Sequence, residues 1–303
     1  MGFELEFTGI SLQQACDALL SSLGGEVREA SAAESLIEIP DLGDFRVEID
    51  WNYLKKLADG QGMDQPHLNL LASAASALVP IEVVCPPLPM DRLASLDPLI
   101  DALRDAGARG TEDSILAAFG VHINTEIPAC DAQTLDRYLK AFALLQWWLV
   151  RAHEVDLTRR LTPYIDLYPD DYLRAVLQRR DPTLAELLED YLAHNATRNR
   201  ALDLLPLLAH LDEGRVRSVV DDDRIKARPA FHYRLPNCQI DQPDWSLAAS
   251  WNVWCVVEHL ADQADARAYL AREFLARWQA PGGIDHDLWT TSVDQWISQS
   301  GLA

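Results

Sequence analysis

Residues 2–7 have the sequence Gly-Phe-Glu-Leu-Glu-Phe, in which apolar and acidic side chains alternate. Such alternation predicts a β-strand, because successive side chains of a strand point to opposite faces. Glu4 and Glu6 would then share one face, where two like charges are costly unless a cation lies between them. Carboxylate oxygens suit Mg²⁺ or Mn²⁺, so the segment indicates a metal site. The alternative is an acidic face in solvent.

Three later segments place polar side chains inside apolar, strand-like runs. Their polar members are Glu48 with Asp50, Glu82, and His122 with Asn124. A carboxylate that is buried in such a run needs a cation or a hydrogen-bond partner. Glu82 is therefore a candidate metal ligand, and the alternative is a charge on an edge strand. His122 is a second candidate, and the alternative is a hydrogen-bonded histidine in the core.

Residues 226–234 form a basic segment that begins with Lys226 and ends in a predicted strand. Arg228, His232 and Arg234 have even spacing, which places all three on one face of that strand. If this face opposed the acidic face within one sheet, the two would make a metal–phosphate site. The acids would hold the ions, and the guanidinium groups would bind phosphate oxygens in bidentate fashion. The alternative is a set of salt bridges between strands without a ligand.

Residues 197–203 form a second basic segment, Thr-Arg-Asn-Arg-Ala-Leu-Asp. Thr197 has the character of an N-cap residue and predicts a helix over residues 199–211. Arg198 and Arg200 would then lie near the N-terminus of that helix, where backbone amides and the helix dipole favour anions. The alternative is a surface charge cluster paired with Asp203.

The segments that carry these residues alternate with predicted helices. Strands are predicted at 2–7, 26–29, 35–39, 45–50, 81–85, 116–127 and 230–235, and helices at 11–23, 97–107, 132–153, 171–178, 182–194, 199–211, 245–278 and 288–297. Residues 1–130 are thus strand-rich, and residues 131–303 are mostly helical with one late core strand near 228–235. This order predicts an α+β fold, with helices packed on one face of an antiparallel sheet, and a single catalytic domain over residues 1–303.

The charge of the chain limits its partners. Its 303 residues include 47 acidic and 26 basic side chains, so its net charge is −21. A nucleic-acid duplex would be repelled by that charge, and no apolar run has the length that a membrane span needs. The five cysteines are scattered without a C-x-x-C pair, and no secretory signal is visible, which predicts reduced thiols and a cytoplasmic location. The sequence contains no P-loop and no G-x-S-x-G motif.

Four of these segments occur in an order that resembles the amidoligase family, distant relatives of glutamine synthetase and glutamate–cysteine ligase. The four segments are residues 2–7, 81–88, 119–124 and 231–234, and the resemblance extends to about residue 260. It implies a glutamine-synthetase-like sheet whose concave face binds ATP and divalent cations, Mg²⁺ or Mn²⁺.

The resemblance also implies roles for individual residues. The expected metal ligands are Glu4, Glu6, Glu82, His122 and His232, with Glu48 or Asp50 as a further acid. The expected catalytic cations, which would stabilise the transferring phosphoryl group, are Arg234, Arg228 and Arg198. The residues expected to contact the cofactor are Arg200, Lys226 and Asn124.

Two positions depart from the pattern of the family. Asn124 stands where the family often has a second histidine, and His232 stands where it usually has a glutamate. A neutral imidazole binds Mg²⁺ less well than a carboxylate does. One metal site would therefore be weakened, or it would prefer Mn²⁺.

The resemblance implies ATP-dependent formation of an amide or peptide bond through an acyl phosphate. The carboxylate and amine substrates would be small molecules, peptides or protein side chains, and a homo-oligomer would be in keeping with the wider superfamily. Two alternatives stay open. One is a non-catalytic scaffold that binds a protein partner through its helical second part, as the departure at His232 would allow. The other is a metal-dependent hydrolase, which would not require ATP.

Overall fold

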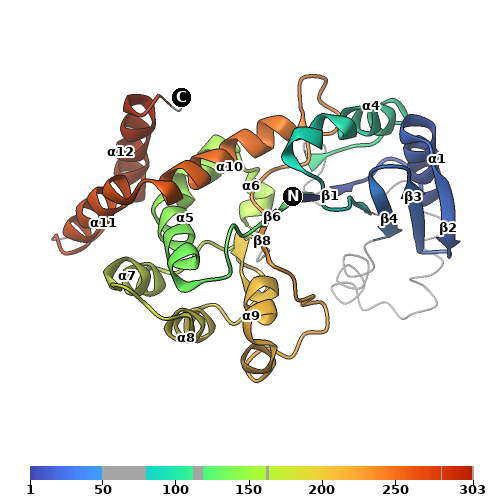
Figure 1. Ribbon diagram of the computed structural model, residues 1–303. Helices are drawn as coiled ribbons and strands as arrows, with labels where there is room; N and C mark the ends of the chain where they lie inside the picture. Colours follow the sequence, from blue (N-terminus) through green and yellow to red (C-terminus); the bar gives the residue numbers. More distant parts are fainter. Residues whose placement is uncertain (50–79, 112–118, 162–163, 281, 302–303) are drawn as a thin grey trace, which may run out of the picture. The chain divides into compact units, whose positions relative to one another are not determined.

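The computed structural model describes residues 1–49, 80–111, 119–161, 164–280 and 282–301 (Figure 1). The chain forms two compact units. The first unit consists of residues 1–124 and 236–249, and the second consists of residues 125–235 and 250–303. Both units contain fully buried apolar side chains, such as Leu5 in the first and Phe142 in the second.

The first unit is built on an antiparallel sheet. Its strands are β1 (Gly2–Phe7), β2 (Glu26–Ala30), β3 (Glu34–Ile39), β4 (Gly43–Ile49), β5 (Ile81–Val84) and β6 (Val121–Glu126), which runs on into the second unit. They pair in the order β2-β3-β4-β5-β1-β6, and every neighbouring pair is antiparallel. The predicted antiparallel sheet is therefore confirmed, and each strand predicted here overlaps an observed one.

The strands of this sheet have one apolar face because their sequences alternate. Phe3, Leu5 and Phe7 of β1 are at most 1% exposed. Glu4 and Glu6, which lie between them, are partly exposed on the other face. The period of two in the sequence thus separates a core face from a polar face along β1.

Helix α1 (Leu12–Leu23) covers the apolar face. It packs on β3 and β4 and against helix α4 (Asp97–Asp105), which follows the short 3-10 helix η1 (Met90–Leu96) (Figure 1). Ser11 caps α1 in a reciprocal capping box with Gln14, as the spacing of the two residues predicts. The polar face of the sheet is thereby the face that can present carboxylates to a ligand.

A late segment, residues 236–249, returns to the first unit. It passes so close to Gly110 that a Cβ at that position would lie 2.0 Å from the carbonyl oxygen of Cys238. The amide of Gly110 donates to Oδ1 of Asp241 at 3.0 Å. Glycine is required here because any side chain would push the late segment away.

The second unit is mainly helical and is arranged around α5 (Ala132–Ala152), which contacts α7, α8, α11 and α12. The helices that follow α5 are α6 (Leu157–Arg160), α7 (Asp170–Gln178), α8 (Leu184–His194), α9 (Leu205–Arg217), α10 (Leu247–Asp262), α11 (Ala264–Trp278) and α12 (His286–Gln299). A short antiparallel ladder joins β7 (Leu202–Asp203) to β8 (Ala230–Tyr233).

Two predicted helices were wrong in their limits. The helix predicted over residues 199–211 begins only at Leu205, because β7 first pairs with β8 and a proline then occupies the first turn of α9. The segment predicted as helical over 245–278 is two helices, since the chain leaves helical geometry at Gln263.

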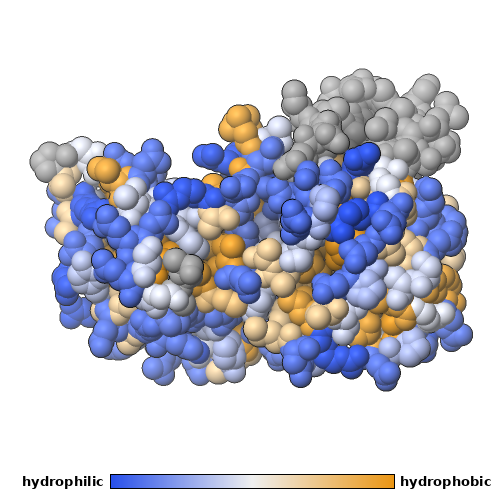
Figure 2. All heavy atoms as spheres, turned by 90° about the horizontal axis from the view of Figure 1, so that it is seen from above, coloured by the Kyte–Doolittle hydropathy of each residue, from blue (hydrophilic) through white to orange (hydrophobic). Residues whose placement is uncertain are grey.

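None of the described helices is both long and apolar enough to cross a membrane. In the view of Figure 2, hydrophilic residues cover most of the surface, with apolar areas between them. Exposed large apolar side chains include Leu161 and Leu288, and such residues are normal on the surface of a folded protein.

Candidate functional site

Four glutamates form a row across the polar face of the sheet in the first unit. They are Glu34 on β3, Glu48 on β4, Glu82 on β5 and Glu6 on β1, and the strand register places each directly opposite the next. Side chains in such positions have Cβ atoms about 4.5–5.5 Å apart, and like charges there destabilise a sheet. This glutamate row therefore indicates a place where a cation would be stabilising.

One end of the glutamate row lies beside an arginine. Nε of Arg46 lies 3.6 Å from Glu34, and its Nη1 lies 3.8 Å from Glu48. The side chains of Arg46 and Glu34 are about half exposed, so their pair contributes little to stability. The protein thus offsets only part of the charge at this end.

The other end of the row is a candidate metal site that consists of Glu6, Glu82 and His122. One ligand atom from each of the three residues lies within 4.8 Å of the others. Oε2 of Glu6 accepts a hydrogen bond from the amide of Gly120 at 2.8 Å, and Oε1 lies 3.6 Å from Nε2 of His122. Two carboxylates suit Mg²⁺ or Mn²⁺, and the imidazole shifts the preference away from Mg²⁺.

Glu4 determines which nitrogen of His122 carries the proton. Nδ1 of His122 lies 2.9 Å from Oε2 of Glu4, and an ionised carboxylate can only accept, so Nδ1 is the donor. Nε2 then keeps its lone pair on the side that faces Glu6. Asn124 donates to the other oxygen of Glu4 at 2.9 Å and holds that carboxylate in place. Metal-ligating histidines commonly have such a carboxylate behind them.

The first unit therefore brings most of the predicted acidic site together. The predicted residues that meet there are Glu4, Glu6, Glu82, His122 and Asn124. Glu48 lies next to this group, because the strand register places it directly opposite Glu82. Its side chain is 28% exposed, so it can be reached from solvent. Asp50 lies outside the described residues.

The second unit contains the predicted basic residues, among which Arg234 has a buried acidic partner. Nη2 of Arg234 lies 3.3 Å from Oδ2 of Asp203, which is fully buried. Burial raises the pKa of Asp203, although the charges of Arg234 and Arg198 act in the opposite direction. Oδ1 of Asp203 also accepts from the amide of Leu205 at 3.0 Å. Asp203 thus holds the guanidinium of Arg234 in one position.

Arg198 lies near this pair, and the N–H groups of its guanidinium are available to a ligand. Burial and the neighbouring charge of Arg234 lower the pKa of Arg198. Across the described ranges, Arg198 makes no hydrogen bond and no ion pair, and the buried Nε of Arg234 has no hydrogen-bond partner. Adjacent guanidinium donors of this kind suit a phosphate or carboxylate group.

Two other predicted basic residues have different surroundings. Arg200 donates to the carbonyl oxygens of Leu167 at 2.9 Å and His194 at 3.1 Å, so its guanidinium holds a loop together. Lys226 is exposed.

The prediction that Arg198 and Arg200 lie at the N-terminus of a helix, where the helix dipole would attract anions, is wrong. Helix α9 begins at Leu205, so neither arginine lies at its N-terminus. The hydroxyl of Thr197 accepts from the amide of Asn199 at 3.2 Å within a loop, and it caps no helix there. The attraction of Arg198 for anions comes from its guanidinium and its neighbours, not from a helix dipole.

Two residues around the arginines have roles that the sequence analysis did not predict. Asp203 was considered only as the partner of a surface charge cluster, whereas it is fully buried and pairs with Arg234. Arg159 is the other: it is 3% exposed and donates to the carbonyl oxygens of Arg234 and Leu235, both at 2.7 Å. Arg159 lies in the short helix α6, where no sequence pattern marks it as buried.

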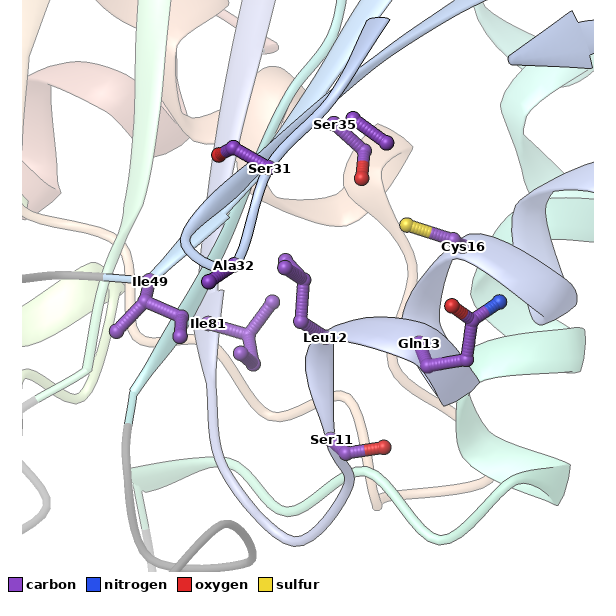
Figure 3. A pocket seen from close by; sticks show the side chains of 10 residues that line it. Ser11, Leu12, Gln13, Cys16, Ser31, Ala32, Ser35, Ile49 and Ile81 are labelled. Atoms are coloured by element: carbon purple, nitrogen blue, oxygen red, sulfur yellow. The ribbon is translucent and has the colours of Figure 1, made fainter. Parts of the chain in front are cut away.

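A pocket of about 330 Å³ lies between the start of α1 and the sheet of the first unit (Figure 3). It is lined by Cys16 of α1 and by Ser35, Ile49 and Ile81 of the strands. The three strand residues belong to the apolar face of the sheet, whereas the glutamate row lies on the polar face. The pocket is therefore not the place where the carboxylates would act.

Comparison with known proteins identifies the family of the chain. The model of a family described as putative amidoligase enzyme matches residues 1–256. The chain belongs to this amidoligase family. The resemblance that the ordered motifs predicted is thereby confirmed. No curated protein and no solved structure shows a significant match to the chain.

Proposed function

We propose that this amidoligase is an ATP-dependent carboxylate–amine ligase that forms an amide or peptide bond through an acyl phosphate. The observation that carries the proposal is the in-register row of Glu48, Glu82 and Glu6 that ends at His122. Membership of the amidoligase family supports a ligase. The cluster of arginines in the second unit supports a substrate that carries phosphate.

The donor set of the first unit fits divalent cations. Glu6, Glu82 and Nε2 of His122 would hold one Mg²⁺ or Mn²⁺, and Glu48 could contribute to a second ion through its position opposite Glu82. Glu4 would orient His122 rather than bind the ion through the oxygen that accepts from Nδ1. When bound, the cations would neutralise charge on the phosphate oxygens of ATP.

The reaction would proceed in two displacements. A carboxylate oxygen of the acid substrate attacks the γ-phosphorus of ATP, the bond to the bridging oxygen breaks, and ADP leaves with that electron pair. The amine nitrogen then attacks the carbonyl carbon of the acyl phosphate. Inorganic phosphate leaves, and the proton of the amine passes to solvent. Arg234 and Arg198 would stabilise the negative charge of the transferring phosphoryl group.

The substitution Glu6→Gln tests the metal site. Glutamine keeps an oxygen that can accept from the amide of Gly120 but removes the charge. We expect Mn²⁺ affinity, measured by electron paramagnetic resonance, to fall on the order of 10–100-fold or more, since even changes behind a ligand have that effect. The matched control is Glu34→Gln at the exposed, arginine-paired end of the same row, which should change the affinity less than about twofold.

Turnover distinguishes the ligase from its alternatives. Purified protein with Mn²⁺ and ATP should release phosphate when it is given a panel of carboxylates and amines. Nucleotide binding without turnover would favour the scaffold, and bond cleavage without ATP would favour the hydrolase. Equal Mn²⁺ binding by wild type and Glu6→Gln would show that the first strand was assigned the wrong role.

A further inference from the structure

The first unit contains a basic residue to which the sequence analysis gave no role. The basic residues predicted from the sequence lie in the second unit, where Nη2 of Arg228 lies 3.1 Å from Nδ1 of the buried His232. Arg46, by contrast, lies on β4, next to the strand that carries Glu82. Among the residues of β1, β3, β4, β5 and β6, Arg46 is the only arginine or lysine.

Arg46 lies on the polar face of the sheet. Phe45 and Val47, its neighbours in β4, are fully buried, so their side chains point to the apolar face and that of Arg46 points the other way. Glu48 of the glutamate row lies two residues further along the same strand, on the same face. The strand register places Val84 of β5 directly opposite Arg46. Arg46 therefore borders the glutamate row without being part of it.

The guanidinium of Arg46 is not saturated by the acids near it. Its side chain is 49% exposed, and its ion pairs with Glu34 and Glu48 have distances of 3.6 Å and 3.8 Å. Both distances are too long for hydrogen bonds, and the side chain of Arg46 makes no hydrogen bond to any residue that the structure describes. Because a guanidinium has five N–H donors and no acceptor, Arg46 can donate to an anionic ligand.

Val84 lies between Arg46 and the residues of the candidate metal site. It is partly exposed, and it stands opposite Arg46 on one side and opposite Glu4 on the other. Arg46 and Glu82 are diagonal neighbours across β4 and β5. The Cβ atoms of such neighbours lie about 7–8 Å apart, a distance within reach of long side chains. A ligand over the uncharged Val84 can therefore contact Arg46 and a cation on Glu82 at the same time.

We propose that Arg46 binds a phosphate oxygen of a polyphosphate ligand whose cation is held by Glu6, Glu82 and His122. The inference rests on the proposed function, because the cation and the phosphate groups belong to it. Phosphate groups that accompany a cation to this face are repelled by the carboxylates around it, and a guanidinium offsets that repulsion. A guanidinium also matches phosphate oxygens with two parallel hydrogen bonds. The first unit alone would then provide both the ligands for the cation and a donor for phosphate.

The competing role for Arg46 is that of a permanent counter-ion for Glu34 and Glu48. Two observations disfavour it: the pairs are long, and the side chains of Arg46 and Glu34 are about half exposed, so the pairs contribute little to stability. The two roles differ in what they predict for removal of Arg46. A counter-ion would leave room for a second divalent cation when it is removed, whereas a phosphate ligand would take phosphate affinity with it.

Replacement of Arg46 with methionine tests the proposal. Methionine keeps an apolar stem and removes the charge and the donors. Isothermal titration calorimetry with inorganic tripolyphosphate in the presence of Mn²⁺ measures the binding of phosphate groups without a nucleotide. We expect Arg46→Met to weaken this binding on the order of 10-fold or more, since hydrogen bonds to charged groups are strong. Arg46→Lys, which keeps the charge but not the planar group, should recover only part of the affinity.

Arg28→Met is the matched control. Arg28 lies on β2 at the edge of the same sheet, its side chain is 50% exposed, and it forms an ion pair with Glu38. Its loss should change tripolyphosphate affinity less than about twofold, because exposed pairs of this kind contribute little. Mn²⁺ affinity, measured by electron paramagnetic resonance without phosphate, should be equal or higher in Arg46→Met, because a positive charge has left the row. This measurement also shows that the site of the variant is folded.

The outcomes separate this proposal from the proposed function. Equal tripolyphosphate affinity of wild type and Arg46→Met would overturn the role of Arg46, and so would a wild type that binds no tripolyphosphate with Mn²⁺. A loss of Mn²⁺ affinity as large as the loss of tripolyphosphate affinity would show a structural role and overturn it as well. A wild type that binds Mn²⁺ and tripolyphosphate but never turns over ATP would contradict the ligase alone, since the comparison of the variants requires no turnover.

Discussion

Replacement of Glu82 with glutamine should change the stability of the first unit in opposite directions with and without a divalent cation. Glu82 has Glu48 and Glu6 directly opposite it on the neighbouring strands. A cross-strand pair of charges is worth about 0.2–1 kcal/mol. Without a cation, removal of two repulsive pairs should therefore raise the free energy of unfolding by about 0.4–2 kcal/mol.

Mn²⁺ should reverse the order of stability. At a Mn²⁺ concentration about 100 times the Kd, binding adds about 2.7 kcal/mol to the free energy of unfolding of the wild type. Loss of the ligand Glu82 should remove most of this contribution, because even residues behind a ligand affect affinity on the order of 10–100-fold. The wild type should thus be less stable than the variant in EDTA and more stable than it with Mn²⁺.

Hydrogen exchange measured by mass spectrometry is the suitable assay, because the two units need not unfold together. The peptides that contain β1 and β5 report on the strands of the glutamate row. Glu34→Gln serves as the control, because Arg46 already lies beside Glu34 at the exposed end, and it should change protection little in either condition. The reasoning fails if Glu82→Gln exchanges faster than the wild type in EDTA, or if Mn²⁺ protects both proteins equally.

Two further predictions concern buried groups. Asp203→Asn should lower the free energy of unfolding of the second unit by about 3–5 kcal/mol, because it leaves Arg234 without its buried carboxylate. Faster hydrogen exchange of β7 and β8 would show this, whereas Glu213→Gln, in an exposed helical pair, should change the free energy of unfolding by less than about 0.5 kcal/mol. Burial, with a smaller effect of the charge of Glu4, raises the pKa of Cys85 to about 12, so its thiol should resist iodoacetamide at pH 8 while the exposed Cys130 reacts. Peptide mapping after alkylation measures both thiols, and rapid labelling of Cys85 in the folded protein would contradict its burial.

Local patterns in the sequence were sufficient to predict most elements of the fold. The alternation in residues 2–7 separates an apolar face from an acidic face, and the capping box of Ser11 and Gln14 marks the start of α1. These signals involve residues only a few positions apart, so they can be interpreted without knowledge of the tertiary structure. The shared face of Glu4 and Glu6 follows from the same local geometry.

The pairing of strands was decided by the tertiary structure. Glu6, Glu82 and Glu48 come from distant parts of the chain, and a slip of one residue in any pair of strands would move a whole set of side chains to the other face. The sequence identifies these acids as candidates, but their register depends on contacts that no short segment contains.

The hydrogen-bond partners of the polar residues were likewise decided by the tertiary structure. Glu4 sets the tautomer of His122 from a neighbouring strand, and Arg228 contacts Nδ1 of His232 from the segment before β8. Asp203 lies in β7, which pairs with β8, and it is fully buried there, whereas the sequence predicted that residues 199–211 form a helix. A sequence specifies which groups can donate or accept, whereas distances between distant segments determine which of them meet.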